Sequence, residues 1–98
     1  FDGIYAHSDS MATGARLALK KAGIPPNSII IIGIDYITEA RKAIMDGEQA
    51  ATFTYPTGGK EGAQATLTIL RGEEVPKEIV IESTMVTRDN AETVVPIF

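Results

Sequence analysis

The sequence predicts an α/β domain with a mostly parallel sheet and helices on both faces. Short apolar segments rich in β-branched residues alternate along the chain with segments whose apolar residues recur at helical spacing. The connections between these segments are short, as in strands joined by right-handed helical crossovers. We therefore expect the element order β-α-β-α-β-α-β over the 98 residues.

Four segments have the composition of strands. Residues 1–6 and 50–54 are short and end at polar or aromatic residues, and residues 79–86 alternate less regularly. Residues 29–34 form a continuous run of isoleucines broken only by Gly33, which is typical of a strand buried on both faces. An apolar tail at residues 94–98 is compatible with a strand or a linker.

Three segments have the pattern of helices. The first covers residues 11–22, with Asp9 or Ser10 as the expected cap and Gly23 followed by two prolines as the stop. The second runs from about residue 38 to residue 45. The third follows a Thr-Gly-Gly segment at residues 57–59 and ends at Arg71-Gly72. These boundaries place each helix between two strands.

The composition excludes several classes of function. The net charge is -4, which argues against direct binding of nucleic acid, because backbone phosphates attract a surplus of Lys and Arg. The chain has no Cys and one His, so we expect no disulfide, no metal site and no cofactor. The longest apolar run is too short to cross a bilayer.

Polar side chains follow three of the predicted strands. The first strand ends at His7-Ser8-Asp9, the second at Asp35 and the third at Tyr55. In an open α/β sheet, ligands bind outside the carboxyl ends of the strands. A carboxylate accepts hydroxyl hydrogen bonds, a hydroxyl donates or accepts, and a tyrosine ring offers a flat apolar face. This collection suits a polyol such as a sugar.

Each of these residues also has a structural interpretation. Asp9 is a good helix cap, and Asp35 suits the start of the next helix or a turn. Tyr55 before a proline could cover the edge of the sheet, and His7 could lie in a solvated loop.

Four segments resemble motifs of type I periplasmic binding proteins and of lac-repressor-like effector domains. Residues 5–15 (YAHSDSMATGA) resemble x-A-x-N-D-x-M-A-x-G-A, and residues 31–35 (IIGID) resemble V-V-G-F-D. Residues 50–56 (AATFTYP) resemble A-A-T-V-x-Q-P, and residues 81–90 resemble the closing strand with its V-T-x-x-N end. Residues 55–59 are also similar to periplasmic sugar-sensing domains of hybrid two-component kinases.

The resemblance implies Rossmann-like lobes that close on a ligand without altering it. In the ribose-binding branch, the ligand is bound by the Asn before the Asp of the first motif, by the Asp of the second and by the Gln of the third. These positions are Ser8, Asp35 and Tyr55 here, so only the Asp is retained. The aromatic residue before that Asp is replaced by Ile34. The ligand expected from this comparison is a monosaccharide other than ribose.

The resemblance also implies how the chain is divided. It predicts a C-terminal fragment in which residues 1–55 belong to the second lobe and residues 56–98 form the hinge crossover and part of the first lobe. The expected partners are the missing N-terminal lobe, a sugar, and a membrane transporter or a sensor kinase in the periplasm.

Other functions fit the residues less well. A phosphoacceptor receiver domain needs a Lys at a strand end, and none is present. A Walker-type phosphate loop needs a Gly at the position of Thr54. An enzyme using Asp9 and Asp35 as acid and base lacks a nucleophile–base pair. The effector domain of a lac-repressor-like regulator remains the alternative to a periplasmic binding protein.

Overall fold

The computed structural model describes residues 1–98 and confirms the α/β class. Strands β1 (Gly3–Tyr5) and β2 (Ile30–Ile32) pair in parallel, with Ile4 opposite Ile31. They are connected by helix α1 (Asp9–Lys21) and a short 3-10 helix, η1 (Pro26–Ser28). Helix α2 (Thr38–Met45) then leads to β3 (Thr52–Phe53). No helix is both long and apolar enough to span a membrane.

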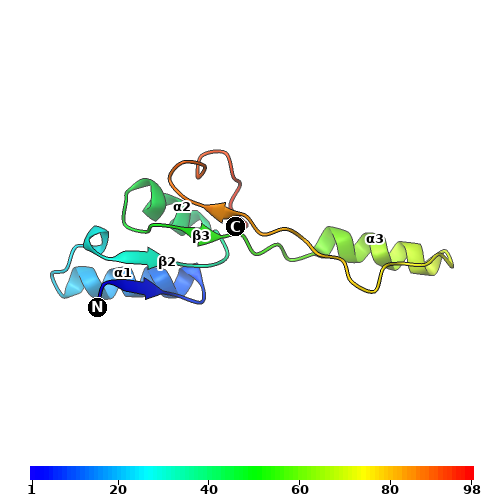
Figure 1. Ribbon diagram of the computed structural model, residues 1–98, viewed down its shortest axis with the longest axis horizontal. Coiled ribbons are helices and arrows are strands. Elements are labelled where there is room, and N and C mark those ends of the chain that lie inside the picture. Colours follow the sequence, from blue (N-terminus) through cyan, green and yellow to red (C-terminus); the bar gives the residue numbers. More distant parts are fainter.

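The strands follow one another across the molecule in the order β1-β2-β3-β4 (Figure 1). Parallel bridges from Ile32 to Ala51 and from Asp35 to Thr54 join β2 to β3. Strand β4 (Met85–Val86) pairs antiparallel with β3. The first three strands therefore run in the same direction, and their carboxyl ends meet at one edge.

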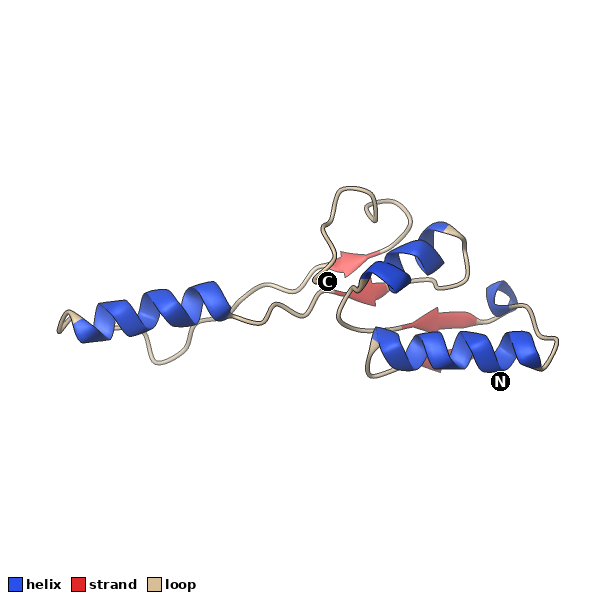
Figure 2. Ribbon diagram, turned by 180° about the vertical axis from the view of Figure 1, so that it is seen from behind, coloured by secondary structure: helices blue, strands red, loops and turns tan.

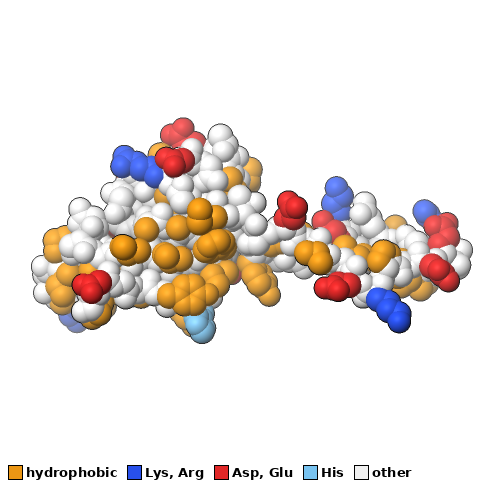
Figure 3. Space-filling model, viewed as in Figure 1, with side chains coloured by type: hydrophobic (Ala, Val, Ile, Leu, Met, Phe, Trp, Pro, Cys, Tyr) orange, Lys and Arg blue, Asp and Glu red, His pale blue; other side chains and the backbone are white.

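Within residues 1–98, helices cover one face of these strands, and not both faces as the sequence predicts. Helices α1 and α2 lie side by side on that face (Figure 2). Ile31 packs against α1, whereas Tyr5 and Ile30 occupy the alternate positions of their strands and are 62% and 61% exposed. Figure 3 shows hydrophobic side chains gathered on this open face. Burial of one face by right-handed crossovers explains why α1 and α2 share a side.

Two small clusters form the core. The first joins β1, β2 and α1 through Ala6, Ala12, Leu19 and Ile31. The second joins α2 and the C-terminal segment through Tyr36, Ile44, Val86 and Ala91. All buried residues of the chain lie in residues 1–55 or 85–98, which we call the body.

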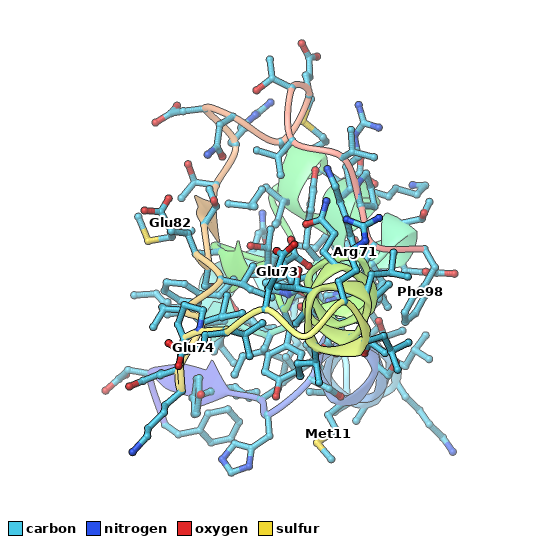
Figure 4. All side chains as sticks on the ribbon, turned by 90° about the vertical axis from the view of Figure 1, so that its right-hand side faces the viewer. Met11, Arg71, Glu73, Glu74, Glu82 and Phe98 are labelled. Atoms are coloured by element: carbon cyan, nitrogen blue, oxygen red, sulfur yellow. The ribbon has the colours of Figure 1, made fainter.

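Residues 56–84 form an arm that projects from the body. Helix α3 (Gly59–Leu70) occupies its first half, and none of its residues is buried. The arm gives the molecule extents of 60 × 23 × 19 Å. Figure 4 looks along α3 from its outer end, where Arg71, Glu73 and Glu74 lie near the turn that reverses the chain.

The structure corrects the expected division of the chain at residue 55. The C-terminal segment returns to the body, because Tyr36 Oη donates a 2.6 Å hydrogen bond to the carbonyl of Ala91. The Ile97 amide also donates to the carbonyl of Tyr36 at 2.9 Å. Only residues 56–84 leave the body, while residues 85–98 belong to it.

The predicted fourth strand, residues 79–86, is also too long. Only Met85–Val86 forms a strand, because residues 79–82 lie in the arm and have no neighbouring strand to pair with. At Thr54 the side chain enters the pairing, accepting a 2.8 Å hydrogen bond from the Thr84 amide at its hydroxyl. The apolar tail at residues 94–98 is not a strand.

Candidate ligand-binding site

Backbone hydrogen bonds hold the three predicted strand ends side by side. The Ala6 amide donates a 2.8 Å hydrogen bond to the carbonyl of Ile32, and the Asp9 amide donates a 2.7 Å hydrogen bond to the carbonyl of Ile34. The Asp35 amide donates a 2.8 Å hydrogen bond to the carbonyl of Phe53. Successive strand ends therefore present Ser8, Asp35 and Tyr55 at one edge of the sheet, as the sequence predicts.

Asp35 occupies the centre of this edge in an unusual backbone conformation. Its φ is 111°, and Tyr36 follows with φ 63°, so two residues with side chains lie in the region that favours glycine. Conformations of this kind cost about 1–3 kcal/mol each and persist where the surroundings hold them. The Asp35 side chain is half-buried and takes part in neither of the ion pairs, Lys20–Glu48 and Lys42–Asp46. Its carboxylate is thus not neutralised by a neighbouring Lys or Arg.

A cavity of about 210 Å³ opens beside Asp35. One side carries Asp35, Thr54 and the ring of Tyr55, which is 65% exposed. The apolar part of the lining comes from Pro56 and from the C-terminal tail. The cavity is lined by Asp35, Thr54, Tyr55, Pro56, Val95 and Ile97. A lining that combines a carboxylate and hydroxyl groups with apolar side chains offers both kinds of contact that a sugar can make.

Sequence reasoning missed the contributions of Val95 and Ile97. The apolar tail was recognisable, but its path was not, because no local pattern shows which strand end it will cover. The observed path depends on Tyr36, whose carbonyl accepts from the Ile97 amide at 2.9 Å.

Ser8 is half-buried and forms the N-cap of α1, where its hydroxyl accepts a 3.1 Å hydrogen bond from the Met11 amide. This corrects the expected cap at Asp9 or Ser10. The Ser8 hydroxyl keeps its own proton for donation. His7 is exposed and does not line the cavity; its ring contacts Tyr5 edge-on, with 5.4 Å between the ring centroids.

Asp9 is not placed to contact a ligand, contrary to the expectation from the sequence, because it is buried and does not line the cavity. Its side chain is fully buried in the first turn of α1, and its carboxylate accepts hydrogen bonds from protein groups. Arg16 lies nearby and is 5% exposed. The pKa of the Arg16 guanidinium is lowered, because the effect of burial exceeds the opposing effect of the charges on Glu48 and Asp9.

The sequence profile of a family described as "Periplasmic binding protein domain" matches residues 1–74. This chain belongs to that family. A provisionally named rhizopine-binding protein of Rhizobium meliloti is 39% identical over 92 residues, which are 92% of this chain and 30% of that protein. The ribose import binding protein RbsB of Escherichia coli is 30% identical over 87 residues, or 87% of this chain and 29% of RbsB.

Solved structures of periplasmic binding proteins superpose on this family member. The fructose binding periplasmic domain of a hybrid two-component system has a TM-score of 0.83 and 37% identity, covering 94% of this chain and 31% of that one. This chain spans about a third of the length of these relatives. The family expected from the motifs is therefore confirmed, and the repressor alternative finds no support among these matches.

Proposed function

We propose that this periplasmic binding protein segment forms one wall of a site that binds a monosaccharide or a similar small polyol without altering it. One observation supports the proposal. The unpaired carboxylate of Asp35 lies beside the aromatic ring of Tyr55 at the carboxyl edge of the sheet, in a chain of this family. The carboxylate would accept ligand hydroxyl groups, and the ring would pack against the apolar face of the sugar. Ser8 would donate from the neighbouring strand end.

Binding without catalysis fits the chemistry of the cavity. A hydrolytic or transfer reaction needs a nucleophile or an acid–base pair within hydrogen-bond reach of the substrate. The polar side chains of the lining are Asp35, Thr54 and Tyr55, and none is joined to a His, Lys or second carboxylate. They suit recognition of hydroxyl groups better than bond cleavage.

The relatives suggest the class of sugar. Their names and descriptions include ribose, fructose, myo-inositol and several furanose sugars. Ser8 and Tyr55 replace the amide side chains expected in the ribose-binding branch, so the ligand of this protein should make fewer amide hydrogen bonds and more ring contacts. Fructose, which is named for the structural neighbour of 37% identity, is the first candidate ligand.

The remainder of the site would come from a second lobe. The open cavity covers only one side of a ligand, and closure of two lobes on the sugar would exclude water from the Asp35 carboxylate. We propose that the protein works in the periplasm and delivers its sugar to a membrane transporter or reports it to a sensor kinase. His7, exposed and outside the cavity lining, would lie at the rim of the closed site.

A thermal-shift and calorimetric screen tests this proposal. The full-length protein encoded by the gene is titrated with D-fructose, D-ribose, L-arabinose, xylitol and myo-inositol. At least one should raise the melting temperature, and Asp35→Ala should weaken its binding about a hundredfold, because hydrogen bonds to a charged group contribute roughly 1.5–3 kcal/mol each.

The control is Asp46→Ala, which removes the carboxylate at the C-cap of α2 that pairs with Lys42 at 2.7 Å and lies outside the cavity lining. It should leave sugar affinity unchanged. Equal affinities of the parent and of Asp35→Ala would rule out Asp35 as a ligand contact.

A further inference from the structure

The turn that presents Asp35 needs an external support. Asp35 and Tyr36 both have positive φ, 111° and 63°, and neither is glycine. Isolated, this dipeptide would relax to ordinary backbone angles, which would turn the Asp35 side chain to a different direction. Some group in the body must therefore stabilise the left-handed conformation.

The buried carboxylate of Asp9 is that group. Its Oδ2 atom accepts hydrogen bonds from the Tyr36 amide at 2.7 Å and from the Ile37 amide at 3.4 Å. The same oxygen accepts a 2.9 Å hydrogen bond from the Thr52 hydroxyl on β3. One carboxylate oxygen thus connects the turn after β2 to the strand that leads to Tyr55.

A second set of contacts fixes Asp9 itself. Its Oδ1 atom accepts a 2.8 Å hydrogen bond from Gln49 Nε2, and Gln49 accepts from the buried guanidinium of Arg16. A side chain at position 33 would clash with this group, since a Cβ on Gly33 would lie 2.1 Å from Asp9 Oδ1. Because every contact is buried, the carboxylate has little freedom to move.

We propose that Asp9 is a positioning residue that holds the Asp35–Tyr36 turn in its left-handed conformation and thereby sets the direction of the Asp35 carboxylate toward the ligand. The inference rests on the proposed function, in which Asp35 binds the sugar. Asp9 acts from beneath the edge without touching the ligand, and Thr52 extends its effect to the strand that leads to Tyr55. Preorganisation of this kind raises affinity because the free protein does not have to order the turn on binding.

The test compares sugar affinity with stability in the full-length protein, using D-fructose and the other four compounds of the panel as probes. The variants are Asp9→Asn, Thr52→Val and Thr52→Ser. Asp9→Asn and Thr52→Val should weaken binding about tenfold, the effect of losing one buried hydrogen bond to a charged group. Thr52→Ser keeps the hydroxyl and should restore the parent affinity.

The matched control is Leu19→Ala, which removes a buried side chain of the first core cluster far from the turn. It lowers the melting temperature, yet it should leave affinity unchanged when measured well below that temperature. The backbone amide resonances of Tyr36 and Ile37 give a readout that needs no ligand. They should shift in Asp9→Asn and Thr52→Val but not in Leu19→Ala.

The outcomes separate the two proposals. If Asp35→Ala loses binding while Asp9→Asn and Thr52→Val bind as the parent does, the positioning role is wrong and the sugar site stands. If Asp35→Ala binds normally, the proposed sugar site fails, and the two amide resonances still decide whether Asp9 holds the turn. Equal loss of affinity in Leu19→Ala and Thr52→Val would overturn the positioning role, because general destabilisation would then account for both.

Discussion

The body and the arm of this molecule reach their structures by different means. In the body, residues 1–55 and 85–98 bury two apolar clusters and a carboxylate network between strands and helices. In the arm, α3 has regular helical geometry but buries no residue, and Leu67 and Leu70 are 53% and 77% exposed. A helix of this length is marginal in water by itself, and without buried side chains α3 contributes little to the stability of the body.

The comparison also locates the candidate site. The Asp35 cavity lies where the arm leaves the body, with Tyr55 and Pro56 on the outgoing chain and Val95 and Ile97 on the returning segment. The lining of the cavity therefore combines residues at the point where the arm begins with residues of the C-terminal segment.

The largest expected difference between the two regions concerns apolar truncation. Ile31→Ala removes a fully buried side chain of the body and should lower the free energy of unfolding by about 3 kcal/mol. Leu70→Ala in the arm should change it by less than about 0.5 kcal/mol. Urea unfolding of the 98-residue chain, followed by circular dichroism, measures both. Similar losses would show that the arm is packed as tightly as the body.

Substituting one glycine in the body and one in the arm should have opposite and smaller effects on stability. Gly33→Ala should cost about 2 kcal/mol, since its Cβ would overlap the Asp9 carboxylate in the body. Gly62→Ala in α3 meets no atom within 4 Å and should favour the helix by up to about 1 kcal/mol. The urea midpoint measures the effect of Gly33→Ala on the body, and the helical ellipticity measures the effect of Gly62→Ala on α3. A tolerated Gly33→Ala would contradict the close contact with Asp9.

The smallest expected effect is a pH dependence confined to the body. Burial raises the pKa of the Tyr36 phenol above its ordinary value of about 10, and Arg41 partly opposes this. The folded state therefore favours the neutral phenol. Its contribution to stability is complete below pH 10 and is lost as the pH rises through the folded-state pKa.

Spectroscopic titration checks this expectation. The ultraviolet absorbance of tyrosinate should include a late step that disappears in Tyr36→Phe, and the alkaline loss of stability should be smaller in that variant. A late step that persists in Tyr36→Phe would mean that another tyrosine is the buried one.

Much of the local structure follows from neighbouring residues. The second and third helices end where a glycine follows the apolar stripe, and the first starts at the cluster of small polar residues before Met11. The placement of Ser8, Asp35 and Tyr55 at one edge of the sheet was predictable as well, because parallel strands bring their carboxyl ends together. The choice of cap among Ser8, Asp9 and Ser10 was not, since all three can cap a helix.

The sequence by itself determined the α/β alternation, the helices and the edge where the ligand is expected, because these depend on periodicity and on stop signals within a few residues. Tertiary structure alone decided that residues 85–98 return to the body, that Val95 and Ile97 line the cavity, and that Asp9 is buried beneath the Asp35 turn. These features join groups that are distant in the chain: Asp9 meets Tyr36 and Thr52 only after two crossovers have been made. Their energies depend on burial and on shared hydrogen bonds, which no short segment can encode.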